Sequence, residues 1–503
     1  MSDPSLPSGL PCRRQLAVTW GIPDRYGGMT AALLHRSRLF ARAGATADVV
    51  TFESRPDYDV VRADLEERGE LDDGVVLRNI YEDFRAATRT AMPAPSRPSP
   101  APAARPPDDE IVTAAGTVRR WTTGDVLVRV EHLRADGTLA VLEQLPRADA
   151  STRVVTALDV HGRVTGRWES LRRFRFAWLD EVLAGEPAVA VVDSKVAAHS
   201  LQHYRRANVT LIHLVHGAHH DAAGRLTQSR RELFEHLDRW DAVCFLTERQ
   251  RDTAIAALGD TGGLHVVHNA VTVPDRMPLR PPDRLHGVIV SRLSRLKRLD
   301  QALEVMARVR ALGVPVTAEI VGDGPDRRRL EKEAARLGLD GVVRFAGYTT
   351  NAAERFADGA WTLLTSRSEG ESLSLLEAMG AGCVPVAYDI PYGPAELIRP
   401  GRTGHLVADG DIAAATAALV ELCTLDDDAF AELRRSARRV AEEGHSDDAA
   451  LARWAEVERA AMRRHDDSRR RARRSFVRRA VGRAVRVSRG AVRALRGSTP
   501  HPR

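Results

Sequence analysis

The 503-residue sequence lacks the long apolar runs that membrane proteins need. No stretch reaches the ~18 consecutive apolar residues of a transmembrane helix, and the N-terminus does not combine positive charge with an apolar segment as secretory signals do. Cysteine is also scarce, and the four cysteines show neither paired spacing nor the spacing of metal ligands, which argues against disulfides and against a zinc site. We therefore expect a cytoplasmic protein.

Lysine is nearly absent. Lys195, Lys297 and Lys332 are the only lysines among 74 basic residues, and the others are arginine. Coding bias accounts for the general preference and for Lys332 on a charged helix face, but a lysine at a ligand-binding edge of such a chain suggests a specific role.

Charge is distributed unevenly along the chain. The segment 463–503 holds 15 arginines against two aspartates, whereas the whole chain has a net charge of only +6. The body of the protein is therefore mildly acidic and its tail strongly basic, and basic tails of this kind interact with anionic surfaces.

The length indicates two to three domains, of which the first begins with a βαβ pattern. Residues 15–52 are typical of a strand, a glycine turn, a helix at 30–43 and a second strand, with Gly27 and Gly28 at the helix entrance. Glycine at such a turn allows a ligand to approach the backbone closely. The alternative is that the two glycines serve only a tight turn.

The α/β pattern is then interrupted by an insertion. Residues 91–109 contain seven prolines and no apolar periodicity, which is typical of a stiff, disordered segment. Residues 110–168 alternate in short runs around Asp136-Gly137 and His161-Gly162 turns, which predicts antiparallel β-hairpins. We expect this part to serve acceptor binding or homo-oligomerisation rather than chemistry.

The α/β pattern resumes at residue 187 and, after a proline-rich link, continues in a second run from residue 286. The fold class is therefore α/β, with two Rossmann-like domains at 12–275 and 285–445, followed by a closing helix at 446–462. The two domains are expected to face each other across a cleft, which is the default ligand site.

The stretch SRSEGESLSLLEAM, residues 366–379, joins an expected buried strand to an apolar helix that begins at Leu373. Glu369 lies in the turn before this helix, and Glu377 lies near its second turn. A helix N-terminus at the carboxyl ends of parallel strands offers free N–H groups and the positive end of a dipole, which predicts a phosphorylated ligand. The alternative for Glu377 is a surface charge.

Two cations follow the first strand of the second domain, in SRLSRLKRLD, residues 291–300. Arg292 at the strand end and Lys297 just before the next helix should point into the same cleft as the helix at Leu373. Two cations beside a helix N-terminus suit a diphosphate. A solvated basic loop is the alternative.

These motifs together resemble the donor-binding half of retaining glycosyltransferases of family 4, which have the GT-B fold. The resemblance covers nearly all of residues 15–460 and is most specific in the two glutamates with seven residues between them; the VGDGP loop and the GYT turn add to it. The chain is most similar to the branch of bacterial poly(glycerol-phosphate) and poly(ribitol-phosphate) α-glycosyltransferases of wall teichoic acid. That branch carries a hairpin-rich insertion and a YDIxYGP segment, here Tyr388–Pro394.

The resemblance implies a role for each motif residue. Glu369 would contact hydroxyls of the donor sugar and Glu377 the ribose hydroxyls, since a carboxylate can accept two hydroxyl hydrogen bonds. Arg292 and Lys297 would hold the diphosphate and stabilise the charge that grows on it. No metal or other cofactor is implied. The implied donor site is completed by Gly27, Gly28, Tyr348, Gly370, Ser372 and Leu373.

Histidines cluster where a strand of the first domain is expected to end, in LIHLVHGAHH, residues 211–220. The resemblance implies that His216 lies beneath the donor sugar and the acceptor, with His219 as the second candidate. A zinc cluster with His213 and His220 is the alternative, but no acidic or cysteine ligand pattern accompanies them. The expected catalytic residues are His216, Glu369, Arg292 and Lys297.

The resemblance implies transfer of a sugar, with retention of configuration, from a nucleotide sugar, UDP-linked by analogy, to a hydroxyl of a polyol-phosphate or related cell-envelope acceptor. Transfer to a protein or to a lipid-linked glycan remains an alternative. A non-catalytic scaffold with the same fold, associated with a membrane or with nucleic acid, is an alternative of another class.

The tail, residues 463–503, is typical of a basic amphipathic helix, with Val477, Val481 and Val485 near one face. This pattern predicts peripheral attachment to an anionic membrane surface, the inner face of the cell membrane. Nucleic-acid binding is less favoured because Phe476 is the only aromatic residue available for stacking.

Overall fold

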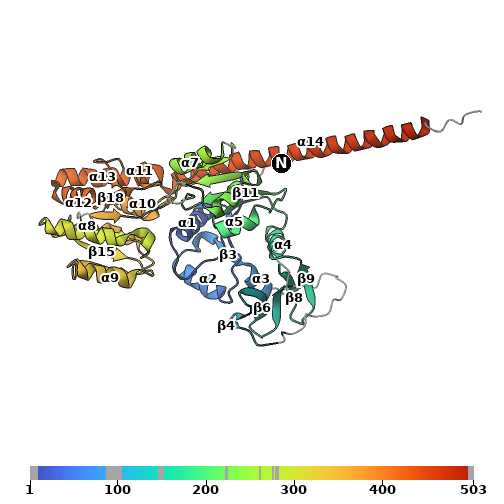
Figure 1. Cartoon of the computed structure of the whole chain (residues 1–503), viewed down its shortest axis with the longest axis horizontal. Coiled ribbons are helices and arrows are strands. Elements are labelled where there is room, and N and C mark those ends of the chain that lie inside the picture. The colour runs from blue at the N-terminus through green and yellow to red at the C-terminus, as the bar shows by residue number, and fades with distance from the viewer. Residues whose placement is uncertain are drawn as a thin grey trace, which may run out of the picture.

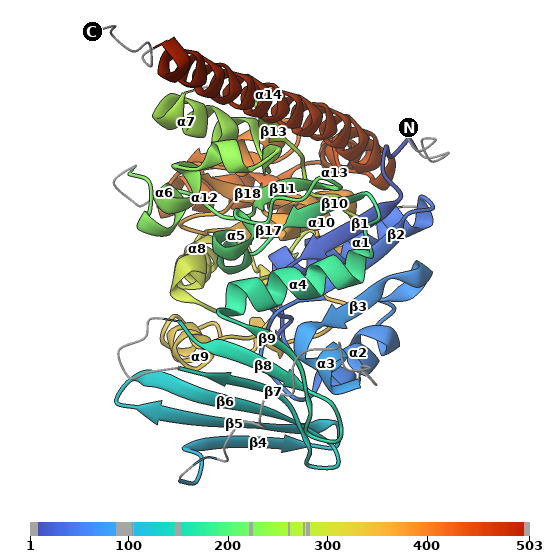
Figure 2. The same cartoon turned by 90° about the vertical axis from the view of Figure 1, so that its right-hand side faces the viewer.

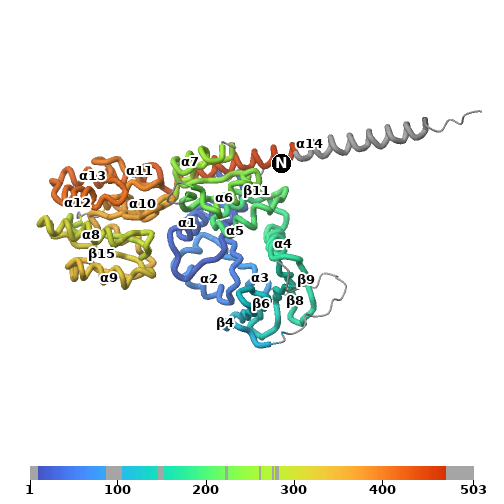
Figure 3. Tube along the Cα trace, viewed as in Figure 1, coloured from blue at the N-terminus to red at the C-terminus, as the bar shows by residue number. Residues whose placement is uncertain are grey.

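In the computed structural model, two α/β domains lie side by side and an antiparallel sheet extends from the first (Figure 1). The structure describes residues 9–86, 103, 105–145, 152–220, 225–259, 262–274, 277 and 282–496, with side chains up to 471 (Figure 3). Most of the proline-rich segment 91–109 and the tail side chains after 471, including those of the expected apolar face, lie outside the described residues.

The first domain, called the N domain, is built on a seven-stranded parallel sheet in the order β13-β12-β11-β10-β1-β2-β3. Its strands are rich in valine, leucine and isoleucine and buried on both faces, as a parallel sheet between helices requires. The strands are β1 (Arg14–Val18), β2 (Thr46–Thr51), β3 (Val76–Asn79), β10 (Ala188–Val192), β11 (Val209–Val215), β12 (Ala242–Phe245) and β13 (Leu264–Val266). The helices are α1 (Gly28–Arg42), α2 (Tyr58–Glu67), α3 (Ile80–Ala86), α4 (Leu171–Leu183), α5 (Lys195–Leu201), α6 (Gln228–Phe234) and α7 (Glu248–Leu258).

The insertion forms a six-stranded antiparallel sheet in the order β4 to β9, at the end of the N domain far from the C-terminal helix (Figure 2). The two predicted hairpins are present, because Gly137 and Gly162 take positive φ in the β6–β7 and β8–β9 turns. The strands are β4 (Asp109–Thr113), β5 (Gly116–Thr123), β6 (Val126–Arg134), β7 (Leu139–Gln144), β8 (Val154–Leu158) and β9 (Val164–Trp168).

A buried polar cluster fastens this sheet to the N domain. The Tyr81 ring of α3 stacks on the His132 ring of β6 with centroids 3.9 Å apart, and its hydroxyl donates to Glu143 Oε1 of β7 at 2.6 Å. His132 Nε2 lies 3.2 Å from the same oxygen. Since buried polar groups that satisfy one another fix a single arrangement, the insertion is held as a rigid extension of the N domain.

The second domain, called the C domain, has a six-stranded parallel sheet in the order β16-β15-β14-β17-β18-β19. Its strands are β14 (His286–Val290), β15 (Thr317–Val321), β16 (Val343–Gly347), β17 (Trp361–Leu364), β18 (Val384–Asp389) and β19 (His405–Ala408). The helices are α8 (Leu299–Ala311), α9 (Arg327–Arg336), α10 (Leu373–Gly380), α11 (Pro394–Leu397), α12 (Ile412–Thr424) and α13 (Asp427–Gly444).

The chain returns to the N domain in the long helix α14 (Asp447–Arg496), drawn in red in Figure 1. Trp454 and Val457 of α14 are buried in a core that also contains Phe40 and Ile212 of the N domain. The helix continues without a break past residue 462, the predicted end of the closing helix, and Arg469 Nη1 in the predicted tail donates to Ala207 O at 2.7 Å.

The predicted fold class is confirmed: the chain has two parallel sheets of the GT-B type, a hairpin insertion in the N domain and C-terminal helices. The predicted element bounds need small corrections. The first helix begins at Gly28 rather than at residue 30, because Gly27 already takes the extended conformation of an N-cap residue. No helix among the described residues is long and apolar enough to cross a membrane.

Candidate active site

The candidate site lies where the carboxyl ends of the two sheets meet. In the C domain the strand order reverses between β14 and β17, and in the N domain between β1 and β10. Such switch points are where open α/β sheets bind ligands. At the C-domain switch point a small cavity is lined by Ser291, Lys297, Thr365, Ser366 and Ser374.

Lys297 and Glu369 meet at this edge. Lys297 Nζ donates to Glu369 Oε1 at 2.6 Å, and both side chains are partly exposed, by 22% and 12%. The sequence predicted these two residues for different parts of one ligand, and the structure brings them into direct contact. A partly exposed ion pair at the mouth of a cavity can exchange its internal bond for bonds to a ligand at small cost.

Arg292 is exposed, and although Ser291 Oγ donates to its carbonyl oxygen, its side chain forms no hydrogen bond or ion pair with another described residue. Arg298, which the sequence analysis did not single out, is instead built into the backbone of the site. It takes a left-handed conformation with φ of 45° and donates to Thr365 O at 2.8 Å and to Ser366 O at 2.7 Å. Arg298 therefore fixes the end of β17, whereas Arg292 is available to a ligand.

Helix α10 begins at Leu373, as the sequence predicts, and its start is anchored by its apolar face. Leu375, Leu376 and Met379 are buried against α13, and each such side chain contributes roughly 1.5–3 kcal/mol. Among the described side chains, none is hydrogen-bonded to the first N–H groups of α10 as an N-cap. These N–H groups are thus left for an anion at the cavity.

The carboxyl group of Glu377, in the second turn of α10, has no hydrogen bond or ion pair with any described residue. Burial raises the pKa of its carboxyl group to about 7. A carboxylate without a partner beside a phosphate-binding edge is arranged to accept hydrogen bonds from a ligand, which favours the predicted ribose contact over a surface charge.

We expect the variant Glu377→Gln to show a pH-dependent gain in stability. The folded wild type keeps a proton up to about pH 7 that the unfolded chain releases near its ordinary pKa of 4.5, so its free energy of unfolding falls as pH rises from about 4.5 to 7. The neutral amide avoids this loss, and the melting temperature should exceed that of the wild type by about 2–4 °C at pH 8 and match it at about pH 4. Differential scanning calorimetry measures this. The exposed Glu354→Gln is the control, and a lower melting temperature for Glu377→Gln at pH 8 would contradict the assignment.

On the N-domain side, His216 directly follows β11 and is oriented by a buried ion pair. Its Nε2 atom lies 2.7 Å from Asp193 Oδ1, while Arg36 donates to both oxygens of Asp193 at 2.9 and 2.7 Å. Burial alone would raise the pKa of Asp193, but Arg36 and His216 hold it below its usual value. The ionised Asp193 makes Nε2 the protonated nitrogen of His216, so that Nδ1 keeps a lone pair for a ligand.

His216 and the donor loop of the C domain, residues 366–372, are in contact. A Cβ atom at Gly370 would lie 1.9 Å from the carbonyl oxygen of His216, so that only glycine allows this approach. Tyr392 reinforces the contact, because its ring stacks on His219 at 5.4 Å and its hydroxyl lies 3.1 Å from His220 Nδ1. The structure thus brings His216 of the N domain into contact with Gly370 of the C domain.

Gly27 and Gly28 lie across the cleft from the start of α10. A Cβ atom added to Gly28 would lie 3.7 Å from Leu373 Cβ, and one added to Gly27 would meet nothing within 4 Å. Neither glycine has positive φ, so the turn itself does not require glycine. Close approach of a ligand explains the glycine pair better than a tight turn does.

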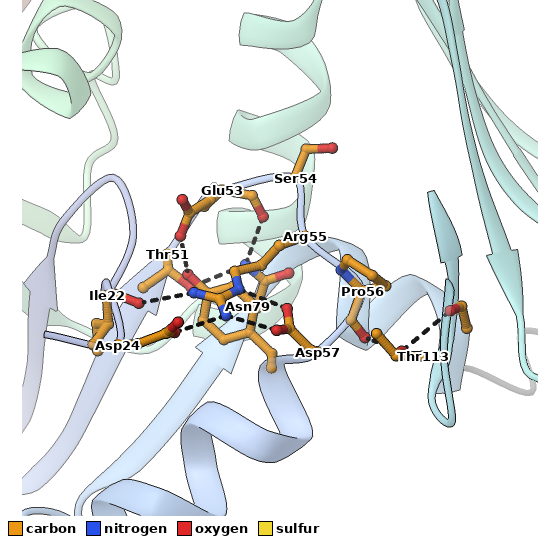
Figure 4. Close-up of polar contacts among 12 residues, drawn as sticks. Ile22, Asp24, Thr51, Glu53, Ser54, Arg55, Pro56, Asp57, Asn79 and Thr113 are labelled. Carbon is orange, nitrogen blue, oxygen red and sulfur yellow. Dashed lines mark hydrogen bonds and ion pairs between the residues drawn. The ribbon is translucent and has the colours of Figure 1, made fainter. Parts of the chain in front are cut away.

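Arg55 braces the loop that leads to these glycines (Figure 4). It donates to Asp24 Oδ1 at 2.9 Å and to both oxygens of Asp57 at 2.6 Å. The insertion reaches the neighbouring loop that carries Arg55, between β2 and α2, through Thr113 Oγ1, which lies 3.5 Å from Pro56 O. No sequence motif indicated Arg55, because Asp24 lies 31 residues before it and only the fold brings the two together.

Two other residues of the predicted site, Tyr348 and His219, do not line the cavity at the C-domain switch point. Tyr348 faces the N domain, with Arg25 5.8 Å from its ring centroid and Arg68 Nη1 3.4 Å from its hydroxyl. His219 is fully buried, and burial lowers its pKa to about 3. The structure therefore favours His216 over His219 as the histidine open to ligands. Among the described residues, the histidines at 213, 216, 219 and 220 do not form a metal-binding group.

The sequence and the fold are similar to those of known sugar transferases. The family described as "Glycosyl transferases group 1" matches residues 278–443. The poly(ribitol-phosphate) alpha-N-acetylglucosaminyltransferase of Staphylococcus aureus is 22% identical over 475 residues, which covers 85% of this chain and 96% of that protein. The chain is a glycosyltransferase: its C domain matches group 1, and the chain as a whole is similar to the retaining enzymes of family 4.

Other relatives of this glycosyltransferase extend the comparison. The poly(glycerol-phosphate) alpha-glucosyltransferase of Bacillus subtilis is 29% identical over 212 residues, 42% of this chain and 32% of that protein. The crystal structure of S. aureus TarM in complex with Fondaparinux, alpha-GlcNAc-glycerol and UDP has a TM-score of 0.72 at 20% identity, covering 89% of this chain and 99% of that one. The pneumococcal O-GlcNAc transferase GtfA with UDP and GlcNAc gives 0.66 at 16% identity, with 90% and 99% covered.

Proposed function

We propose that this glycosyltransferase moves a sugar from a UDP-sugar to a hydroxyl of a polyol-phosphate polymer of the cell envelope. The observation that carries the proposal is the contact between His216 of the N domain and the donor loop of the C domain, beside the Lys297–Glu369 pair. A sugar held by Glu369 would then lie above His216, between the two domains.

The geometry supports a role for each donor-site residue. The diphosphate binds between the N–H groups at the start of α10 and the cations Lys297 and Arg292, which neutralise the charge that develops as the sugar departs. Glu377 accepts from the ribose hydroxyls. The loop at Gly27 and Gly28 closes over the donor from the N domain, since no side chain there blocks it.

The transfer proceeds on one face of the sugar. The bond from the anomeric carbon to the diphosphate breaks as the acceptor hydroxyl attacks from the same side, through a state with oxocarbenium character, and the departing phosphate oxygen takes the hydroxyl proton. Glu369 holds hydroxyls of the sugar throughout, and Nδ1 of His216 accepts a hydrogen bond from the sugar or the acceptor. Neither glutamate acts as a nucleophile.

The acceptor assignment is supported by the two polyol-phosphate relatives and by the insertion, which is held rigidly on the N domain. Because GtfA subunits are named as peptide N-acetylglucosaminyltransferases and GtfA has a similar fold, a protein acceptor is the second candidate. For the localisation, we propose peripheral attachment to the inner face of the cell membrane through residues 463–503. Homo-oligomerisation through residues 110–168 likewise remains a prediction.

The test offers one labelled donor at a time, UDP-glucose, UDP-N-acetylglucosamine or GDP-mannose, to synthetic ribitol-phosphate and glycerol-phosphate oligomers. We expect transfer from one UDP-sugar to a phosphate-containing oligomer and none to the matched phosphate-free polyol. Transfer to a serine-rich peptide alone would favour the protein acceptor. Failure to bind or hydrolyse any nucleotide sugar would refute the donor-site roles.

A further inference from the structure

A second carboxylate of the donor loop, Glu371, points away from the donor cavity and into the junction of the two domains. Its side chain is only 1% exposed. Glu371 Oε2 accepts from the backbone N–H of Asn269 at 2.6 Å, and Oε1 accepts from Nδ1 of His268 at 2.9 Å. Both partners follow β13 of the N domain, so this carboxylate ties the donor loop of one domain to the backbone of the other.

The same carboxylate lies where the chain crosses between the domains. The N domain leaves towards the C domain just after Asn269, and the return crossing begins at His445, whose Nδ1 lies 3.9 Å from Glu371 Oε1. The backbone N–H of Val271 donates to His445 O at 2.9 Å, which joins the two crossings directly. Any change in the angle between the domains therefore acts on this cluster.

The cluster is a set of hydrogen bonds rather than an evident metal site. His268 Nδ1 also lies 2.8 Å from Leu246 O, and His445 Nδ1 lies 3.3 Å from Asn269 O. Because a nitrogen that faces a carbonyl oxygen carries a hydrogen, neither Nδ1 atom offers a lone pair to a cation. Although burial alone would lower it, the charge of Glu371 holds the pKa of His268 above its usual value.

Within the donor loop, Glu371 lies between Glu369 and the start of helix α10. Glu369 is two residues before it, Gly370 packs on the His216 carbonyl, and Ser372 is the N-cap of α10. A shift of Glu371 must move Glu369 and the α10 N-terminus together, relative to His216. We propose that Glu371 is a positioning residue that sets the donor loop against His216 when the domains close, an inference that rests on the donor-site roles proposed above.

The chain contains a matched control. Glu396 of α11 also bridges the domains, since its carboxylate accepts from the backbone N–H groups of Glu248 at 2.8 Å and Arg249 at 2.9 Å. It makes the same kind of contact, from an exposed side chain, and lies outside the donor loop. If both residues only hold the domains together, substituting either one should change kcat equally. If Glu371 has a positioning role, only its substitution should lower kcat.

The experiment compares Glu371→Gln and Glu371→Ala with Glu396→Gln in the full-length protein. We expect Glu371→Gln to lower kcat for UDP-sugar hydrolysis and for transfer by about 10-fold or more, with KM for the donor and Kd for UDP changed less than about 3-fold. Glu396→Gln should retain the wild-type kcat. Melting temperatures identify any variant that fails to fold, and the amide variant, which preserves shape, carries the conclusion if the alanine variant unfolds.

Equal kcat values for Glu371→Gln and Glu396→Gln would overturn the inference, as would a defect of Glu371→Gln confined to UDP affinity. Glu369→Gln, measured alongside, separates this outcome from failure of the donor-site roles. If Glu369→Gln is inactive and Glu371→Gln resembles the wild type, only the positioning role is wrong. If Glu369→Gln is fully active, the donor-site assignment fails regardless of Glu371.

Discussion

Replacing Lys297 with alanine is expected to reduce the transfer rate by about 10²–10³-fold, the loss seen when one preorganised group that stabilises transition-state charge is removed. Lys297 is placed to meet the diphosphate oxygens as they gain negative charge, beside the N–H groups of α10. The defect should appear in kcat more than in KM, because the charge develops in the transition state. Steady-state kinetics with labelled UDP-sugar measure both constants.

Lys332→Ala is the control for this variant. Lys332 lies exposed on α9, away from the cavity, and its loss removes the same charge from the same domain. If both alanine variants reduced kcat equally, the effect of Lys297 would come from the overall charge of the domain and not from the site. A rate unchanged by Lys297→Ala would remove Lys297 from the mechanism.

Replacing Glu369 with glutamine should lower kcat by about 10²-fold, since a sugar that is no longer held by both carboxylate oxygens loses its alignment with the acceptor. The same change frees Lys297 from its 2.6 Å ion pair, so the affinity for UDP alone should stay the same or increase. Calorimetric titration with UDP and single-turnover transfer measurements separate the two effects.

Glu333→Gln is the matched control, because Glu333 also accepts from a cation at 2.6 Å in the C domain but lies on α9. It should leave both constants unchanged. Loss of UDP affinity in Glu369→Gln, with normal turnover of bound donor, would contradict a contact to the sugar.

The place of the donor-loop residues in the fold could be predicted because it depends on local sequence. Glu369, Gly370 and Leu373 lie in one turn between β17 and α10, and the apolar pattern on each side fixes where that turn begins and ends. The same reasoning placed His216 at the end of β11, with no information from the opposite domain.

The residues that orient the site were not predictable, because their partners come from distant parts of the chain. In the sequence, nothing distinguishes Asp193 from other aspartates that follow a strand. Its contacts with Arg36 and His216 form only in the folded protein. In the sequence, Glu371 is one more polar residue of a turn. Only its contact with Asn269, 102 positions away, shows that it bridges the domains. Contacts of this length are set by the assembled domains and leave no periodic pattern in the sequence.

The return of α14 to the N domain has a consequence for how the protein is made. Phe40 and Ile212, from the first half of the chain, share their core with Trp454 and Val457, which leave the ribosome more than 200 residues later. Until then the N domain exposes an apolar surface, and such surfaces promote association of unfinished chains. The N domain therefore completes its folding after the C domain, although its synthesis begins first.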